Sequence, residues 1–237
     1  MQIDTIQLQK LLLIDIQTVA EHLSFEAADA GSRLFWQQKF GSENQDYAQK
    51  AALIPEFGKL ICVSLGGFVA EDKVLTLKVK TFFGIDEKQL LQQVAQALTQ
   101  YKPNDKRILA GHNVKEFDLP FLCKRLAVNN IKMPEILNIW GLKPWDILVL
   151  DTMQLWQFGS FKGFTSLKLL AHSLGVQYPQ PIEVLESIEI QQNYHKNKQD
   201  TTELVTRSQQ NVGLIAQVVL RLKNVEMLPP ENIRFLG

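Results

Sequence analysis

Two apolar runs, each leading to an aspartate, constrain the fold of this chain more than any other feature. Residues 11–15 (Leu-Leu-Leu-Ile-Asp) form the first, and residues 107–118 contain the second, which leads through Asn113 to Asp118. A short apolar run bounded by polar residues predicts a buried strand. Because open α/β folds place their chemistry at the carboxyl ends of such strands, we expect Asp15 and Asp118 at that edge of a sheet.

Two aspartates in this position suit metal chemistry. They can share a divalent ion, and phosphodiester cleavage commonly uses two metal ions. One neighbour argues against a complete site, because Gln17 stands where a second acid would be expected beside Asp15. The pattern therefore predicts a metal-type site with one ligand changed to an amide.

Composition limits the architecture and the partners. With 237 residues and 46% hydrophobic content, the chain can bury a sizeable core, and we expect one domain over 1–237 with an insertion at about 20–59. The 25 basic and 25 acidic side chains give zero net charge, which excludes a bulk basic field for wrapping duplex nucleic acid. Cys62 and Cys123 lie in apolar stretches and are typical of buried thiols.

Targeting features point to a soluble, cytoplasmic protein. Residues 1–4 lack the basic and apolar regions of a signal peptide. No apolar stretch approaches membrane-spanning length, so we expect no membrane partner.

The order of elements predicts a mixed sheet flanked by helices. Strands are expected at residues 11–15, 60–65, 73–80, 107–110 and 147–150, and helices at 86–101, 119–128, 166–174 and 201–222. Helical spacing also runs through the segment at 20–59. Gly66 and Gly67 predict a turn after the second strand.

Several short segments carry a family resemblance. Residues 15–18 resemble the first motif of the DEDD 3'-5' exonucleases, usually Asp-x-Glu, and residues 113–118 resemble the second. The likeness covers residues 10–170 well and the remainder loosely; it includes residues 56–59, 143–146, 151–153 and 155–159. The chain is similar to 3'-5' exonucleases related to the proofreading domain of B-family DNA polymerases. The resemblance implies a ribonuclease H-like three-layer α/β/α fold, with a mixed five-stranded sheet, a helical insertion after the first strand, and four acids holding two magnesium ions.

The resemblance carries over only half of the acids. It implies Asp15 as the ligand of both metals and Asp118 as the second-motif acid. Gln17 replaces an acid, and the third motif, Tyr-x-x-x-Asp, matches a frame with Arg207 for the tyrosine and Asn211 for the aspartate. The loop at residues 181–187 departs from the family pattern as well.

These replacements predict weak metal binding. Magnesium favours charged oxygens, and an amide oxygen brings no charge. Opposite unit charges ~4 Å apart gain roughly 4 kcal/mol at an effective dielectric of ~20. Two lost charges therefore predict that Asp15 and Asp118 hold Mg²⁺ or Mn²⁺ weakly, or hold no metal. Without the tyrosine, hydrolysis by the family mechanism is expected to be lost or much reduced.

Other residues leave alternatives open. Asn113, Phe117 and Trp145 are candidates for nucleic-acid contact; Asn113 could equally satisfy a turn, and Trp145 could be core or stack on a base. Asp151 is typical of a helix N-cap. Trp156 is expected in the core.

A rival third motif is the His-x-x-x-x-Asp spacing of His195 and Asp200, for which a solvated loop is the more ordinary interpretation. Lys115, Lys124 and Arg125 could follow phosphates, and a solvated helix face is the better explanation for them.

Three functions follow, in order of preference. The first is a non-catalytic module that binds single-stranded 3' ends. The second is a scaffold for an unknown protein partner. The third is an active exonuclease that uses substitute acids from His195, Asp200, Glu183 or Glu203.

Overall fold

The computed structural model describes residues 6–41, 46–72, 74–101, 105–143, 145–160, 163–176, 187–197 and 201–236. Its strands are β1 (Leu11–Ala20), β2 (Gly58–Glu71), β3 (Val74–Phe83), β4 (Ile108–Gly111), β5 (Val149–Asp151) and β6 (Ile233–Leu236). Its α-helices are α1 (Ala30–Phe40), α2 (Tyr47–Ala51), α3 (Glu87–Leu98), α4 (Asp118–Val128), α5 (Thr152–Gln157), α6 (Leu167–Ser173), α7 (Ser187–Lys196) and α8 (Thr202–Leu222). Short 3-10 helices are η2 (Leu8–Lys10), η4 (Glu135–Leu137) and η5 (Pro230–Asn232).

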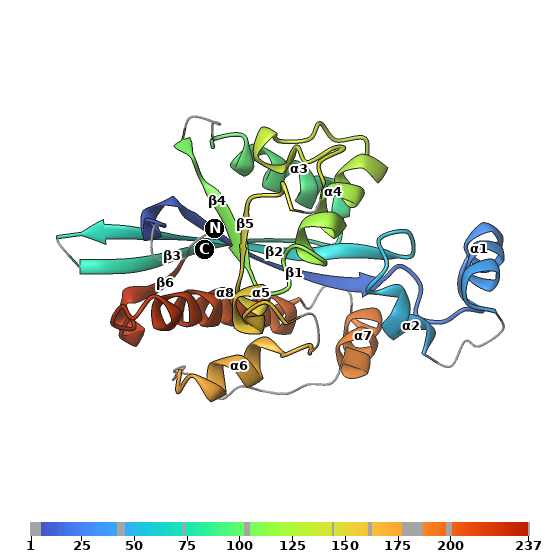
Figure 1. The fold of residues 1–237 in the computed structure, drawn as a ribbon. Coiled ribbons are helices and arrows are strands. Elements are labelled where there is room, and N and C mark those ends of the chain that lie inside the picture. The colour runs from blue at the N-terminus through green and yellow to red at the C-terminus, as the bar shows by residue number, and fades with distance from the viewer. Residues whose placement is uncertain are drawn as a thin grey trace.

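One mixed sheet organises the fold, in the order β5-β4-β1-β2-β3-β6. The central strand β1 runs antiparallel to β2 and parallel to β4. Helices α3 and α4 lie on one side of the sheet, and α8 with α6 lies on the other (Figure 1). The predicted ribonuclease H-like α/β/α class is confirmed, with six strands in the described part of the chain where five were expected.

Alternation along β1 divides the core between the two faces of the sheet. Leu11 and Leu13 pack in a cluster with residues of α6 and α8, whereas Leu12 and Ile14 pack with residues of α3 and α4. Successive side chains of a strand point to opposite faces, so one apolar run supplies both layers. Asp15 has the parity of Leu11 and Leu13 and therefore faces α8.

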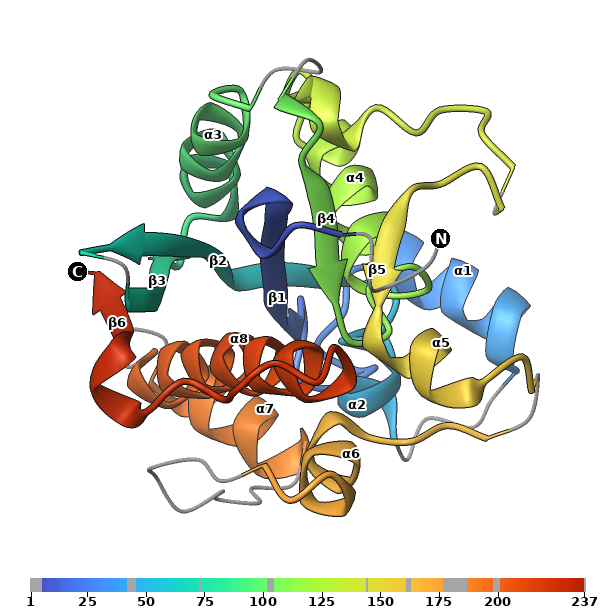
Figure 2. The ribbon, with the colours of Figure 1, turned by 60° about the vertical axis from the view of Figure 1, so that its left-hand side comes forward.

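Helix α8 lies directly against the sheet, as the two ribbon views show (Figure 1, Figure 2). The close approach depends on Gly66 of β2, where an added Cβ would lie 2.5 Å from Cγ1 of Val212 on α8. The predicted turn at Gly66 and Gly67 is wrong, because β2 continues through both residues. The glycine pair permits packing across the sheet instead of ending the strand.

A buried ion pair connects the opposite layer to the sheet. The Arg125 guanidinium of α4 pairs with Glu87 of α3 at 2.5 Å, and Glu87 also accepts a 2.7 Å hydrogen bond from the backbone N–H of Leu60. Arg125 is only 6% exposed, so the predicted solvated face is wrong for this residue. Lys124, the next residue along, is exposed and pairs with Glu56 at 3.7 Å.

The sequence analysis did not predict two of the observed elements, β6 and α7. Strand β6 pairs in parallel with β3, and α7 precedes α8. Cys62 is fully buried and Cys123 is half-buried. Within the described ranges, no helix combines the length and apolar character needed to cross a membrane.

The close packing of α8 predicts that alanine substitutions at two adjacent glycines differ in their effect on stability. Gly66→Ala should lower the free energy of unfolding by ~1–3 kcal/mol, because its methyl group overpacks against Val212. Gly67→Ala is the matched control, since an added Cβ there meets nothing within 4 Å. Urea denaturation of both variants measures the difference. Equal stability of the two variants would contradict the packing argument.

Candidate active site

Asp15 lies on the central strand, at the point where β1 faces α8. It pairs with Ser64 of β2 in the register of the sheet, and its side chain is buried at 9% exposure. A buried carboxylate requires hydrogen-bonding partners or neutralisation to offset its lost hydration. The surrounding side chains supply such partners.

Both oxygens of the Asp15 carboxylate accept a hydrogen bond from an amide. Nε2 of Gln17 donates to Oδ2 at 2.7 Å, and Nδ2 of Asn211 donates to Oδ1 at 2.8 Å. Gln17 is two residues along the same strand and therefore shares the face of Asp15. Asn211 comes from α8, so the two amides join the sheet and the helix through one carboxylate.

Asp118 approaches the same position from the other layer. It is the first residue of α4 and is 6% exposed. Its Oδ1 accepts a 3.1 Å hydrogen bond from the backbone N–H of Ile16, the residue after Asp15. The structure thus brings Asp15, Gln17, Asp118 and Asn211 together, although Asp15 and Asn211 are 196 positions apart in the sequence.

Burial disfavours the charged form of both aspartates. It raises the pKa of Asp15 from 3.8 to about 6, against the opposing effects of the Gln17 and Asn211 hydrogen bonds and the positive charge of Arg207. The pKa of Asp118 is also raised well above its ordinary value, first by burial and then by the negative charge of Asp15. Like charges at close range disfavour double ionisation, so the pair titrates as a unit.

A cavity of about 810 Å³ opens over these residues. Its lining includes seven of the predicted site residues: Asp15, Gln17, Asn113, Phe117, Asp118, Arg207 and Asn211. Trp145 does not belong to this lining; it is 73% exposed, with the Lys143 ammonium 5.5 Å from its ring centroid.

Asn113 sits in a turn that the Asp151 carboxylate holds. Asn113 has a φ of 59°, a left-handed conformation that asparagine tolerates better than most residues. Its backbone N–H donates to Oδ1 of Asp151 at 2.9 Å, and the N–H of Met153 donates to the same oxygen at 3.0 Å. Asp151 is therefore the N-cap of α5, as predicted.

Sequence reasoning missed His112, which also lines the cavity. Its Nε2 lies 2.8 Å from the carbonyl oxygen of Thr165, and its Nδ1 lies 2.9 Å from the hydroxyl of Thr152. Burial lowers the pKa of His112. Its place next to Asn113, directly after an apolar strand, was the available indication. The cavity wall also includes Lys50 and Phe164, which sequence reasoning did not select.

The rival third-motif residues lie elsewhere or outside the described part of the chain. Nε2 of His195 donates a 3.0 Å hydrogen bond to the carbonyl oxygen of Ala20, and His195 is outside the cavity lining. Asp200 and Glu183 are not among the described residues. Glu203 accepts a 3.4 Å hydrogen bond from Asn193. Trp156 is partly buried against the core, as expected.

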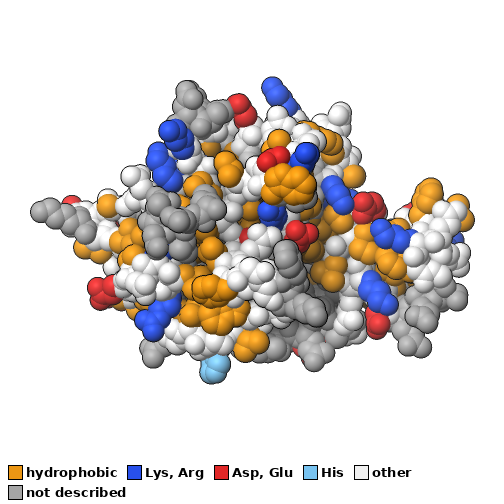
Figure 3. Space-filling view, in the orientation of Figure 1, with side chains coloured by type: hydrophobic (Ala, Val, Ile, Leu, Met, Phe, Trp, Pro, Cys, Tyr) orange, Lys and Arg blue, Asp and Glu red, His pale blue; other side chains and the backbone are white. Residues whose placement is uncertain are grey.

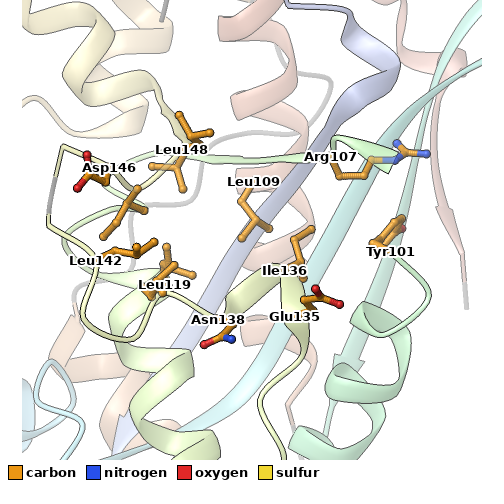
Figure 4. Close-up of a pocket in the computed structure, with 13 residues that line it drawn as sticks. Tyr101, Arg107, Leu109, Leu119, Glu135, Ile136, Asn138, Leu142, Asp146 and Leu148 are labelled. Atoms are coloured by element: carbon orange, nitrogen blue, oxygen red, sulfur yellow. The ribbon is translucent and has the colours of Figure 1, made fainter. Parts of the chain in front are cut away.

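A separate cavity of about 410 Å³ lies beneath the segment between α4 and β5. Leu109 and Leu119 are among its apolar walls, with Arg107 and Tyr101 at one side and Asp146 at the other (Figure 4). None of the paired aspartates and amides lines it, so the chemistry belongs to the larger cavity.

The donor set beside Asp15 does not fit a pair of divalent cations. Within the described ranges, no group of three or more His, Cys, Asp or Glu residues is placed to hold a metal ion. The two amides present N–H donors, and these occupy a lone pair on each Asp15 oxygen. A hard cation instead needs several oxygen donors, with charge among them.

The layered α/β fold, with a carboxylate pair beside its central strand, defines a nuclease-like domain of the ribonuclease H-like class. The sequence matches the family model "DNA polymerase family B, exonuclease domain" over residues 10–145, which is more than half of the chain. The chain therefore belongs to this family and is a 3'-5' exonuclease-like domain. No curated protein matches it. The matched range contains Asp15, Gln17 and Asp118, whereas Arg207 and Asn211 lie beyond it.

The raised pKa of Asp15 predicts an unusual pH dependence of stability. An acid whose pKa is higher in the folded state stabilises the fold when protonated, and this contribution is lost as pH rises from 3.8 through about 6. Asp15→Asn removes the Asp15 carboxyl group from this titration. The variant's free energy of unfolding minus that of wild type should therefore be ~1–2 kcal/mol higher at pH 8 than at pH 5, which means that the variant is relatively more stable at pH 8.

Urea denaturation at both pH values measures this difference. Glu116→Gln, which removes an exposed carboxylate nearby, is the control and should show no comparable change. A pH-independent difference for Asp15→Asn would contradict the buried, protonatable carboxylate.

Proposed function

We propose that this domain binds the 3' end of a single-stranded nucleic acid in the cavity over Asp15, and that two-metal phosphodiester hydrolysis is lost or greatly reduced. The observation that carries the proposal is the hydrogen bonding of Asp15, whose two oxygens each accept from an amide. The site keeps its place in the fold, while its chemistry has changed from acidic to largely neutral.

Electrostatics supports the loss of metal binding. Members of this family normally use divalent metals, which the acids of the site attract through their charge. Here Gln17 and Asn211 are neutral, and burial together with the charge of Asp15 raises the pKa of Asp118, which disfavours ionisation of both aspartates at once. Each missing charge removes up to roughly 4 kcal/mol of attraction per unit cationic charge at ~4 Å. The site can therefore form hydrogen bonds more readily than it can hold Mg²⁺ or Mn²⁺.

The cavity wall supports binding of nucleotides. Phe117 and Phe164 lie along it, and Phe164 is 72% exposed. Aromatic side chains stack on bases with little regard to sequence, typically contributing ~1–3 kcal/mol per base. Asn113 and Lys50 add polar and cationic groups to the same wall.

The charge distribution favours a strand end over a duplex. On the face shown in Figure 3, lysine and arginine side chains are scattered among acidic and apolar ones. Binding along a duplex backbone would call for a continuous basic stripe, because phosphate neutralisation provides most sequence-independent affinity. A cavity that encloses the last nucleotides needs fewer cationic contacts.

The proposed loss of metal binding predicts that restoring the two acids increases the affinity for Mn²⁺. Wild-type protein should shorten a 5'-labelled single strand with Mg²⁺ or Mn²⁺ no faster than Asp15→Ala. The double variant Gln17→Glu/Asn211→Asp should bind Mn²⁺ at least ~10-fold more tightly than wild type, measured by calorimetry, because two charges return beside Asp15.

The control for added charge is Gln92→Glu/Gln96→Glu, which places two acids on the exposed face of α3. It should leave Mn²⁺ affinity unchanged. Wild-type degradation that Asp15→Ala abolishes would instead establish an active exonuclease.

The binding part of the proposal predicts a preference for strand ends. A linear single-stranded oligonucleotide should compete for the cavity more than ~10-fold better than a circular strand of the same length and sequence, because only the linear strand offers a terminus. Fluorescence anisotropy of a bound 5'-labelled strand measures the competition. A 10-fold difference in affinity corresponds to about 1.4 kcal/mol of binding free energy. Equal competition would exclude end binding, and no binding of either strand would leave the protein-scaffold function.

A further inference from the structure

Arg207 is a half-buried cation with an unused binding capacity. It lies on α8, one helical turn before Asn211, and lines the cavity over Asp15. Among the described residues, none accepts a hydrogen bond from its guanidinium or forms an ion pair with it. A guanidinium carries five N–H donors, and those of a half-buried arginine remain accessible to a ligand in the cavity.

The nearest carboxylate does not serve as its partner. The positive charge of Arg207 lowers the pKa of Asp15, so the two groups interact electrostatically. The Asp15 oxygens, however, already accept from Gln17 and Asn211. Arg207 therefore retains its donors for something else.

A second cation lies close to the first. Burial lowers the pKa of Lys168 on α6, and the positive charge of Arg207 lowers it further. Of these two cations, Arg207 lines the cavity. Its positive charge there favours a negatively charged ligand.

Two other basic groups of the cavity wall already have partners. Lys50 pairs with Asp46 at 3.8 Å, and both ring nitrogens of His112 are engaged. Arg207 is thus the lining cation best able to bind an incoming anion. The guanidinium fork matches the oxygens of a phosphate group through two parallel hydrogen bonds.

We propose that Arg207 binds the terminal phosphodiester of the single strand directly, in a complex that requires no divalent metal. This inference rests on the proposed function and adds the residue and the chemistry of recognition. A permanent side-chain cation neutralises the phosphate, so the affinity does not depend on Mg²⁺ or Mn²⁺.

The test measures the affinity of a 5'-fluorescein-labelled ten-nucleotide single strand in EDTA and again with Mg²⁺. Wild type should bind equally well in both. Arg207→Gln should weaken binding by about 10-fold or more, because a charge-assisted bidentate contact is lost. Arg207→Lys should be intermediate, since an ammonium cannot form the fork. Arg221→Gln, the same charge change at the exposed far end of α8, should have little effect.

Salt dependence gives an independent readout. One phosphate contact contributes about 0.7 to the slope of log affinity against log salt for single strands, so Arg207→Gln should flatten the slope by about that amount. Inorganic phosphate, at an equal concentration of phosphate groups, should not displace the strand. Displacement would show a site for free phosphate and would overturn the inference.

The outcomes separate the two proposals. If wild type binds in EDTA and Arg207→Gln binds equally well, the role of Arg207 is wrong and end binding stands. Binding that requires Mg²⁺ also overturns the metal-free complex. If wild type binds no strand under either condition, both proposals fail. Should thermal unfolding show that Arg207→Gln does not fold, Arg207→Lys decides, and affinity equal to wild type contradicts the fork contact.

Discussion

The buried carboxylate of Asp15 is the interaction on which the rest of the site depends. It lies where α8 packs against β1, and it is held by one amide from each element, Gln17 and Asn211. The contact is possible because Gly66 leaves room for α8 to approach the sheet. Without these donors, the helix and strand would enclose a poorly compensated charge, which is strongly unfavourable in a low-dielectric interior. Helix α8 can therefore pack against β1 at this position only if the Asp15 carboxylate also has its hydrogen-bond donors.

The same interaction determines what the site can do. A carboxylate has about four lone-pair positions, and two of those on Asp15 are occupied by amide N–H groups. Metal ions and amide donors use the same lone pairs, so stabilising the carboxylate through donors opposes its use as a metal ligand. Burial and the charge of Asp15 raise the pKa of Asp118, which disfavours ionisation of both carboxylates at once. What remains is a polar cavity whose wall carries two cationic side chains, Arg207 and Lys50.

Much of this site could be predicted from the sequence because its elements follow short-range rules. The apolar run predicted a strand that leads to Asp15, with Gln17 at the expected position of a second acid. The family resemblance placed Asp118, Arg207 and Asn211 beside them, and all five line one cavity. Predictions that required tertiary contacts were less successful. The glycine pair at Gly66 continues a strand because α8 covers it, and Arg125 is buried because Glu87, distant in sequence, pairs with it. His112 was missed because its two partners, Thr152 and Thr165, are brought close only by the fold.

Helix α8 explains how such a site can change while the fold is kept. Its buried residues Leu204, Ser208 and Val212 follow helical spacing along the face toward the sheet, whereas Arg207 and Asn211 are half-buried on the flank that borders the cavity. Residues four apart lie one above the other on a helix, so these two side chains act on the cavity together. Substitution at Arg207 or Asn211 changes a side chain at the cavity and leaves the residues of the buried face as they are. The anion-binding cavity that we propose therefore needs no change in the layers that support it.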